Sequence, residues 1–184
     1  MMTMDAALEH IYTIDDIYAL PEGQRAELID GEFYMMAPPS TAHQRIVHFL
    51  DRTIGNYIHK KGGSCEVFPA PFAVFLEETN QTYVEPDLSV ICDTDKIDEK
   101  GCHGAPDWII EVVSPSSKKM DYYRKLSKYV EAGVKEYWIV DPLKKVIIVH
   151  DLAEMDVPAI YHFSDKVKVH IYEDLEIDFS EIRF

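Results

Sequence analysis

The stretch from residue 105 to residue 142 constrains the fold more than any other part of the chain. It contains an apolar strand over 107–113, a charged helical segment over 118–132 that stops at Gly133, and a second apolar strand over 136–141. A strand, a helix and a strand in close succession are typical of an α/β domain. Both faces of the first strand are apolar, so the sequence predicts a central strand of the sheet.

One carboxylate, Glu111, interrupts this apolar strand. The period of two in a strand places Glu111 on the same face as Ile109 and Val113, while Trp108 and its alternating neighbours point the other way. An unpaired charge is expensive to bury in such surroundings. We therefore expect Glu111 to have partners, and these partners indicate the function.

The remaining elements follow from caps, turns and hydrophobic periodicity. We predict one α/β domain over residues 1–184, with a mixed, bent sheet and no repeats or linkers. Helices are expected over 14–20, after the capping box at Thr13, and over 40–61, before Gly62. The other expectations are a hairpin around Asp30-Gly31, strands near 66–76 and 84–91, a loop over 94–104, and an antiparallel meander after Pro142.

The charges are unevenly distributed. The formal net charge is −15, which disfavours a general nucleic-acid binder at long range. Residues 118–145 nevertheless hold eight basic side chains against four acidic ones, a charge of +4 that leaves −19 for the rest. Two interpretations stay open, an ordinary solvated helix face and a surface that faces phosphates.

The cysteines and the N-terminal residues indicate the cellular compartment. Three cysteines without CxxC spacing, Cys65, Cys92 and Cys102, fit reduced thiols of a cytosolic protein better than a disulfide framework. The first residues lack the pattern of a signal peptide, and no stretch approaches the roughly 20 apolar residues of a membrane helix. We expect a cytoplasmic protein that does not contact membranes.

A second acid lies in another strand with apolar surroundings, at Asp87. If the two strands are neighbours, Asp87 and Glu111 converge, and paired carboxylates with a backbone carbonyl and waters suit Mg²⁺. Such an ion polarises a phosphate and lowers the pKa of a bound water. The alternative is that each acid pairs with a nearby base and has only a structural role.

The helix after Glu111 carries a stripe with a period of four, made of Asp121, Lys125 and Tyr129. A helix that packs back on the sheet would aim Lys125 at the paired carboxylates, where an ammonium orients water or stabilises developing charge. The alternative is a surface pair between Asp121 and Lys125, worth only about 0.3 to 0.5 kcal/mol.

At this point the chain resembles a known superfamily. Pro86-Asp87 followed by Glu111-Val112-Val113, and the order of helix, three strands, helix and strand, resemble the PD-(D/E)XK restriction-endonuclease-like superfamily. More narrowly, residues 12–145 resemble the Uma-two family. The motifs that carry this resemblance are ELIDGE, EPDLSVI, PDWIIEVVSPSS, the D-x3-K-x3-Y helix and AGVKEYWIVDP.

The resemblance implies a restriction-endonuclease-like fold, a mixed central sheet flanked by helices with an extra N-terminal hairpin and C-terminal strands. It also implies that Asp87 and Glu111 are catalytic acids and ligands of Mg²⁺ (or Mn²⁺), and the carbonyl of Val112 is expected to add a ligand.

The chain departs from the superfamily at one position. The superfamily pattern implies a lysine two residues after the glutamate, where this chain has Val113. In the narrower family the lysine role falls on the helix, which assigns it to Lys125. Glu27, in ELIDGE, matches a further family acid that completes the metal site or orients water, with a local hairpin pair as the alternative.

The expected function is a metal-dependent endonuclease that hydrolyses phosphodiester bonds of nucleic acid as a homodimer, with DNA as the expected partner. The alternative is a catalytically inactive, homodimeric interaction module that keeps the nuclease fold. His43 and His48 lack the spacing of a helical zinc pair, and no nucleophile elbow or phosphate loop is present. Near the start of the long helix, His43 faces either the cleft or solvent.

Overall fold

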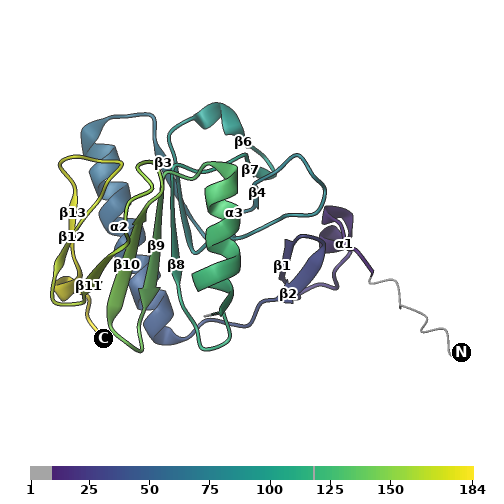
Figure 1. Ribbon diagram of the computed structural model, residues 1–184, viewed down its shortest axis with the longest axis horizontal. Helices are drawn as coiled ribbons and strands as arrows, with labels where there is room; N and C mark the ends of the chain where they lie inside the picture. Colours follow the sequence, from purple (N-terminus) through teal and green to yellow (C-terminus); the bar gives the residue numbers. More distant parts are fainter. Residues whose placement is uncertain (1–9, 118) are drawn as a thin grey trace, which may run out of the picture.

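The computed structural model describes residues 10–117 and 119–184. A six-stranded sheet forms its centre, with the order β11-β10-β9-β8-β5-β3 (Figure 1). Only β8 and β9 run parallel, and the other neighbours are antiparallel, so the mixed sheet expected from the sequence is confirmed. The strands are β3 (Glu66–Pro69), β5 (Leu88–Ile91), β8 (Trp108–Val112), β9 (Glu136–Asp141), β10 (Val146–Asp151) and β11 (Ala159–His162).

Two helical segments cover opposite faces of this sheet (Figure 1). One is α2 (Thr41–Lys61), and the other joins a π-helical turn, η2 (Met120–Arg124), to α3 (Lys125–Ala132). The predicted stop signals are confirmed, because Gly62 and Gly133 end α2 and α3 in the left-handed region, with φ of 68° and 89°.

The alternation of β8 and β9 divides the core into two clusters. Trp108, Ile110 and Trp138 face α2, while Ile109 and Tyr137 face α3. All five side chains are fully buried. The central position predicted for the Glu111 strand is therefore confirmed, since β8 lies between β9 and β5 with apolar packing on both faces.

The N-terminal segment forms a small unit beside the main sheet. It consists of α1 (Ile14–Tyr18) and the hairpin of β1 (Ala26–Ile29) and β2 (Glu32–Met35). The predicted capping box is present. The predicted turn between β1 and β2 is also present, and its residues Asp30 and Gly31 have positive φ, 52° and 78°. Backbone hydrogen bonds join the unit to residues 80–83. Two of them connect Leu28 and Tyr83, at 2.8 and 2.7 Å, and the amides of Ile14 and Gly31 donate to the carbonyls of Asn80 and Gln81 at 3.1 and 3.0 Å.

The segment from 70 to 107 differs from expectation. The strand predicted over 66–76 splits, because β3 ends at Pro69 and β4 (Val74–Phe75) belongs to another sheet. The loop predicted over 94–104 instead contains a short helical turn and two short strands that complete a three-stranded sheet with β4. These elements are η1 (Thr94–Lys96), β6 (Ile97–Asp98) and β7 (Gly101–His103). Strands of two or three residues are too short to show an alternating pattern.

The meander predicted after Pro142 is only partly continuous. β10 and β11 extend the main sheet, whereas β12 (Lys166–Lys168) and β13 (Glu176–Asp178) pair separately before the short helical turn η3 (Phe179–Glu181). No helix in the described part of the chain is both long and apolar enough to cross a membrane.

The expectation of three reduced thiols is wrong. Cys65 and Cys92 form a disulfide, while Cys102 is free and buried. The physical reason is the register of β3 and β5, in which Glu66 pairs with Ile91, so the two cysteines flank that pair on adjacent strands.

Candidate active site

Asp87 and Glu111 meet where β5 and β8 lie side by side. In this antiparallel pair Leu88 is opposite Ile110, so Asp87, one residue earlier, lies beside Glu111. The strand predicted over 84–91 included Asp87, but in the structure Asp87 comes one residue before β5 begins. Pro86 has no N–H to give to a ladder, and Val84 forms its bridge with Val74 outside the main sheet.

The carboxylate of Asp87 is held from two sides. Its Oδ2 accepts a 2.7 Å hydrogen bond from the backbone N–H of Val112. His43, in the first turn of α2, places Nε2 3.1 Å from the same oxygen. His43 does not face open solvent, because its side chain is 12% exposed and contacts Asp87. Two elements of the fold, β8 and α2, thus fix one carboxylate.

Glu111 lies deeper, with 4% of the residue exposed. Its Oε1 accepts hydrogen bonds from Lys125 Nζ and from the Tyr129 hydroxyl, both of 2.8 Å. Its Oε2 lies 3.4 Å from the backbone N–H of Asp87, at the long end of hydrogen bonding. One oxygen of Glu111 is therefore tightly bound, while the other faces Asp87 with little to hold it.

Lys125 is the centre of an ion cluster. Its Nζ lies 2.8 Å from both Glu111 Oε1 and Glu27 Oε2, and 3.4 Å from Asp121 Oδ1. Only 4% of Lys125 is exposed. The surface pair considered for Asp121 and Lys125 is thus wrong, because both side chains are buried against the sheet.

Glu27 reaches the cluster from the N-terminal hairpin. One of its oxygens binds Lys125, and the other accepts a 2.9 Å hydrogen bond from the backbone N–H of Glu85. Glu85 itself is paired with Arg25 and accepts a 2.6 Å hydrogen bond from the Tyr83 hydroxyl. Glu27 is not paired only within its hairpin, because its partners Glu85 and Lys125 are 58 and 98 residues away in sequence.

Asp121 was recognised in the sequence as part of a stripe but not as a member of the site. It lies in η2, where its carbonyl accepts a 2.9 Å hydrogen bond from the Tyr137 hydroxyl, so the turn is fixed over β9. The side chain is buried, yet Oδ1 has no hydrogen-bond donor in the described part of the chain. Its contact with Lys125 is an ion pair of 3.4 Å without hydrogen-bond geometry. Residues of π-helical turns are often found at functional sites.

In the ion cluster, three carboxylates, those of Glu27, Glu111 and Asp121, share the single ammonium of Lys125. Burial raises the pKa of Glu111 well above its usual range, although the charge of Lys125 opposes this. Burial likewise raises the pKa of Asp121 against the opposing effect of Lys125. Burial lowers the pKa of Lys125, but Glu111 and Glu27 outweigh it and raise that pKa well above its usual range. Lys125 therefore stays protonated while the acids share its charge.

His43 also responds to its carboxylate partner. Burial lowers the pKa of His43, but the hydrogen bond and the charge of Asp87 outweigh this effect, and the pKa lies above its usual value. The contact of 3.1 Å between the imidazole and the carboxylate holds the Asp87 side chain in one orientation.

The donor set suits a hard cation. Carboxylate oxygens are the ligands that Mg²⁺ and Mn²⁺ prefer, and Mg²⁺ is usually held by only one or two carboxylates together with waters. Oε2 of Glu111, beside Asp87, and the orphaned Oδ1 of Asp121 are available oxygens. In the described residues no three His, Cys, Asp or Glu side chains are spaced as a complete metal centre. Asp87 and Glu111 fit such an ion, with waters as further ligands.

Four of the eight bases over 118–145 form ion pairs. Arg124 binds Glu32 at 2.6 Å, and Lys135 binds Asp107 at 2.6 Å. Lys128 lies 2.5 Å from Asp30 and 3.3 Å from Glu77, while Lys125 is buried. Lys118 lies outside the described residues. These four paired bases do not form a phosphate-facing patch.

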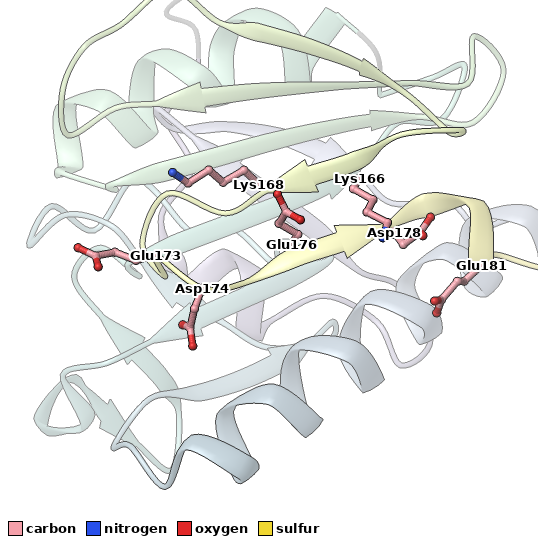
Figure 2. A pocket seen from close by; sticks show the side chains of 7 residues that line it. All are labelled: Lys166, Lys168, Glu173, Asp174, Glu176, Asp178 and Glu181. Carbon is pink, nitrogen blue, oxygen red and sulfur yellow. Dashed lines mark ion pairs between the residues drawn. The ribbon is translucent and has the colours of Figure 1, made fainter.

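A separate groove of about 650 Å³ lies over the β12–β13 hairpin (Figure 2). Seven charged side chains line it, and five of them are acidic. They are Lys166, Lys168, Glu173, Asp174, Glu176, Asp178 and Glu181. The groove shares no residue with the carboxylate cluster, and its negative charge disfavours phosphate groups.

Comparison with known proteins identifies the family and the fold. Residues 14–180 match the model of the Uma2 family, described as "Putative restriction endonuclease". The uncharacterized protein slr1290 of Synechocystis sp. is 31% identical over 106 residues, which span 58% of this chain and 54% of that protein, so the match covers about half of the relative. A crystal structure of a "putative nuclease belonging to DUF820" from Anabaena variabilis superposes with a TM-score of 0.75 and 20% identity, over 92% of this chain and 96% of that one. This similarity confirms the restriction-endonuclease-like fold.

Proposed function

Because the chain belongs to the Uma2 family of putative restriction endonucleases, we propose that it is a metal-dependent endonuclease that hydrolyses phosphodiester bonds of DNA. The observation that carries the proposal is the meeting of the half-buried Asp87 with the buried Glu111 and Lys125, in the order that the family resemblance implies. Lys125 Nζ lies 2.8 Å from Glu111 Oε1, and Glu111 Oε2 faces the backbone of Asp87.

Asp87 and Glu111 would hold the ion, Mg²⁺ or Mn²⁺, and the carbonyl of Val112 is the proposed backbone ligand. A bound ion of this kind polarises a phosphate oxygen and lowers the pKa of a bound water. The amide of the same residue, Val112, already fixes the Asp87 carboxylate through its 2.7 Å hydrogen bond. Orientation of the metal-binding acid is therefore built into β8 itself.

Lys125 replaces the lysine that the superfamily keeps two residues after the glutamate. Val113 occupies that position and packs in the apolar cluster under α3, so it has no polar role. Lys125 reaches the same carboxylate from the next helix, and its ammonium can stabilise negative charge that develops on the phosphate. Glu27 and Asp121 hold that ammonium in place.

The test compares Glu111→Gln with the matched control Glu66→Gln, which changes an exposed acid on β3. Both variants and the wild type are purified identically and incubated with labelled DNA and RNA in Mg²⁺, in Mn²⁺ and in chelator. Cleavage should require metal, favour DNA, disappear in Glu111→Gln and persist in Glu66→Gln. Equal cleavage by wild type and Glu111→Gln would disprove the proposal.

The second candidate is an inactive interaction module, and the closed ion cluster favours it. Lys125 is already paired with Glu27 and Glu111, as it would be in a purely structural network. Calorimetry with Mn²⁺ separates the two functions. Stoichiometric binding that is lost in Asp87→Asn supports the nuclease, whereas no binding by the wild type supports the module. Both candidates are proposed as homodimers, a state that sedimentation measures.

A further inference from the structure

The ion cluster around Lys125 leaves one acceptor and one donor without a hydrogen-bond partner in the described part of the chain. The acceptor is Oδ1 of Asp121, on a side chain that is only 2% exposed. The donor follows from the chemistry of an ammonium, which carries three N–H groups. Two of them are taken by the 2.8 Å contacts of Lys125 with Glu111 and Glu27, so one N–H remains.

These two groups are neighbours, because Lys125 Nζ and Asp121 Oδ1 are 3.4 Å apart. Their ion pair lacks hydrogen-bond geometry and therefore satisfies neither group. A buried polar group without a hydrogen bond is costly, so such a pair indicates a ligand. A molecule that accepts one hydrogen bond and donates another satisfies both groups at once. Water is the smallest molecule of this kind, and its oxygen fits about 2.8 Å from each atom.

The surrounding structure fixes the Asp121 side chain. Its backbone N–H donates to the Ser117 carbonyl at 3.0 Å, and its carbonyl accepts a 2.9 Å hydrogen bond from the Tyr137 hydroxyl. Burial raises the pKa of Asp121, while the charge of Lys125 and a side-chain hydrogen bond from Ser117 oppose this effect. A carboxylate held from both ends of its turn is preorganised for a ligand at Oδ1.

Asp121 also lies on the inner side of the candidate active site. The side chain of Asp87 is 18% exposed, whereas those of Lys125 and Asp121 are 5% and 2% exposed. Besides burial, the charge of Asp87 raises the pKa of Asp121, so the two carboxylates are within electrostatic reach of each other. A phosphate that arrives from solvent meets Asp87 first, with Asp121 behind it. In-line hydrolysis needs this arrangement, because the attacking water and the leaving oxygen lie on opposite sides of phosphorus.

We propose that Asp121 is a further catalytic residue, which binds the attacking water together with Lys125 and accepts its proton, an inference that rests on the proposed function. In this step the water oxygen forms a bond to phosphorus, and the bond from phosphorus to the leaving sugar oxygen breaks. One proton of the water passes to Asp121 Oδ1, and the sugar oxygen takes a proton from solvent. Lys125 donates its remaining N–H to the water oxygen and holds it in place.

The experiment measures steady-state cleavage of labelled DNA in Mg²⁺ by the full-length protein. Asp121→Asn and Asp121→Ser are compared with Glu131→Gln, which removes an exposed carboxylate from the same helix. A positioned base contributes about 10²- to 10⁴-fold, so both Asp121 variants should lower kcat at least about 100-fold and leave KM within about threefold. Glu131→Gln should keep both constants. Serine leaves room for the water, so the measurement remains decisive if the asparagine amide disturbs the cluster.

Calorimetry with Mn²⁺ distinguishes this role from that of a metal ligand or a structural residue. Asp121→Asn should bind Mn²⁺ within about threefold of the wild-type affinity, whereas Asp87→Asn should lose binding. A structural role would instead lower metal affinity or stability together with kcat. Loss of Mn²⁺ binding in Asp121→Asn, or wild-type kcat in both Asp121 variants, overturns the inference, while cleavage by the wild type still supports the proposed function. A wild type that does not cleave DNA overturns both.

Discussion

Replacement of Lys125 by methionine tests the electrostatics of the cluster most directly. Methionine fills nearly the same volume but removes the ammonium, which leaves Glu27, Glu111 and Asp121 without the cation that they share. Removal of one partner from a buried ion pair typically costs about 3 to 5 kcal/mol, because the remaining charge stays desolvated. We expect a loss of this size in the free energy of unfolding.

Lys128→Met is the matched control, because the same substitution lies three residues further along α3. The Lys128 side chain is 13% exposed, and its partner Asp30 is 64% exposed, so water screens the pair. Pairs of this kind contribute at most about 1 kcal/mol. Lys125→Met should therefore lower the stability several times more than Lys128→Met.

Urea unfolding at neutral pH measures both losses, and thermal unfolding gives a second reading. For a domain of this length 1 kcal/mol shifts Tm by roughly 2 to 4 °C, so Lys125→Met should melt about 6 to 20 °C below the wild type. Addition of Glu111→Gln to Lys125→Met should recover part of the loss, because one unpaired carboxylate disappears. The reasoning is refuted if Lys125→Met and Lys128→Met lose the same free energy.

Three other expectations concern separate parts of the molecule. Asp121→Asn should leave the free energy of unfolding of the metal-free protein within about 1 kcal/mol of the wild type, because Oδ1 has no hydrogen bond to lose; a loss above about 2 kcal/mol in urea would contradict this. Burial lowers the pKa of His150, so the folded state binds fewer protons than the unfolded state just below the usual pKa of about 6.5. The free energy of unfolding should consequently fall as the pH is lowered from about 7 to 5, and it should fall less steeply in His150→Phe. Identical slopes of the free energy of unfolding against pH in the two proteins would show that His150 does not contribute. Cys65→Ser/Cys92→Ser opens a loop with a sequence separation of 27 and should cost about 2 to 4 kcal/mol, measured in urea without reductant; an unchanged midpoint would show that the bond does not stabilise the fold.

The parts of the fold that the sequence predicted are those governed by local chemistry. Glycines at the ends of α2 and α3, the capping box at Thr13 and the turn at Asp30 depend only on neighbouring residues, and all are present. Strand pairing depends on distant partners. The short strands β6 and β7 exist because Gly101 and its neighbours pair with β4 and with each other, which no local pattern reveals.

The disulfide illustrates the same limit. Cysteine spacing along the chain carries no information about which strands become adjacent, and Cys65 meets Cys92 only through the register of β3 and β5. The disulfide therefore removes the part of the argument about the compartment that depended on reduced cysteines.

In the site, the stripe of Asp121, Lys125 and Tyr129 was visible as a period of four. The burial of this stripe was not visible in the sequence, because it depends on how η2 lies over β9 and on the hydrogen bond that the Tyr137 hydroxyl donates to the Asp121 carbonyl. His43 could be placed on a helix but not oriented, since its partner Asp87 is 44 residues away.

The hairpin that carries Glu27 makes the N-terminal unit a reporter of events in the cluster. β1 and β2 lie outside the six-stranded sheet (Figure 1), and the attachments of this unit include the ion pair of Glu27 with Lys125 and the backbone hydrogen bonds to Tyr83. A cation that draws Lys125 towards or away from Glu27 changes one of those attachments, and with it the free energy of local opening of the unit. Hydrogen exchange at the amides of Ala26–Ile29 would then follow occupation of the site, with no labelled substrate and no cleavage required.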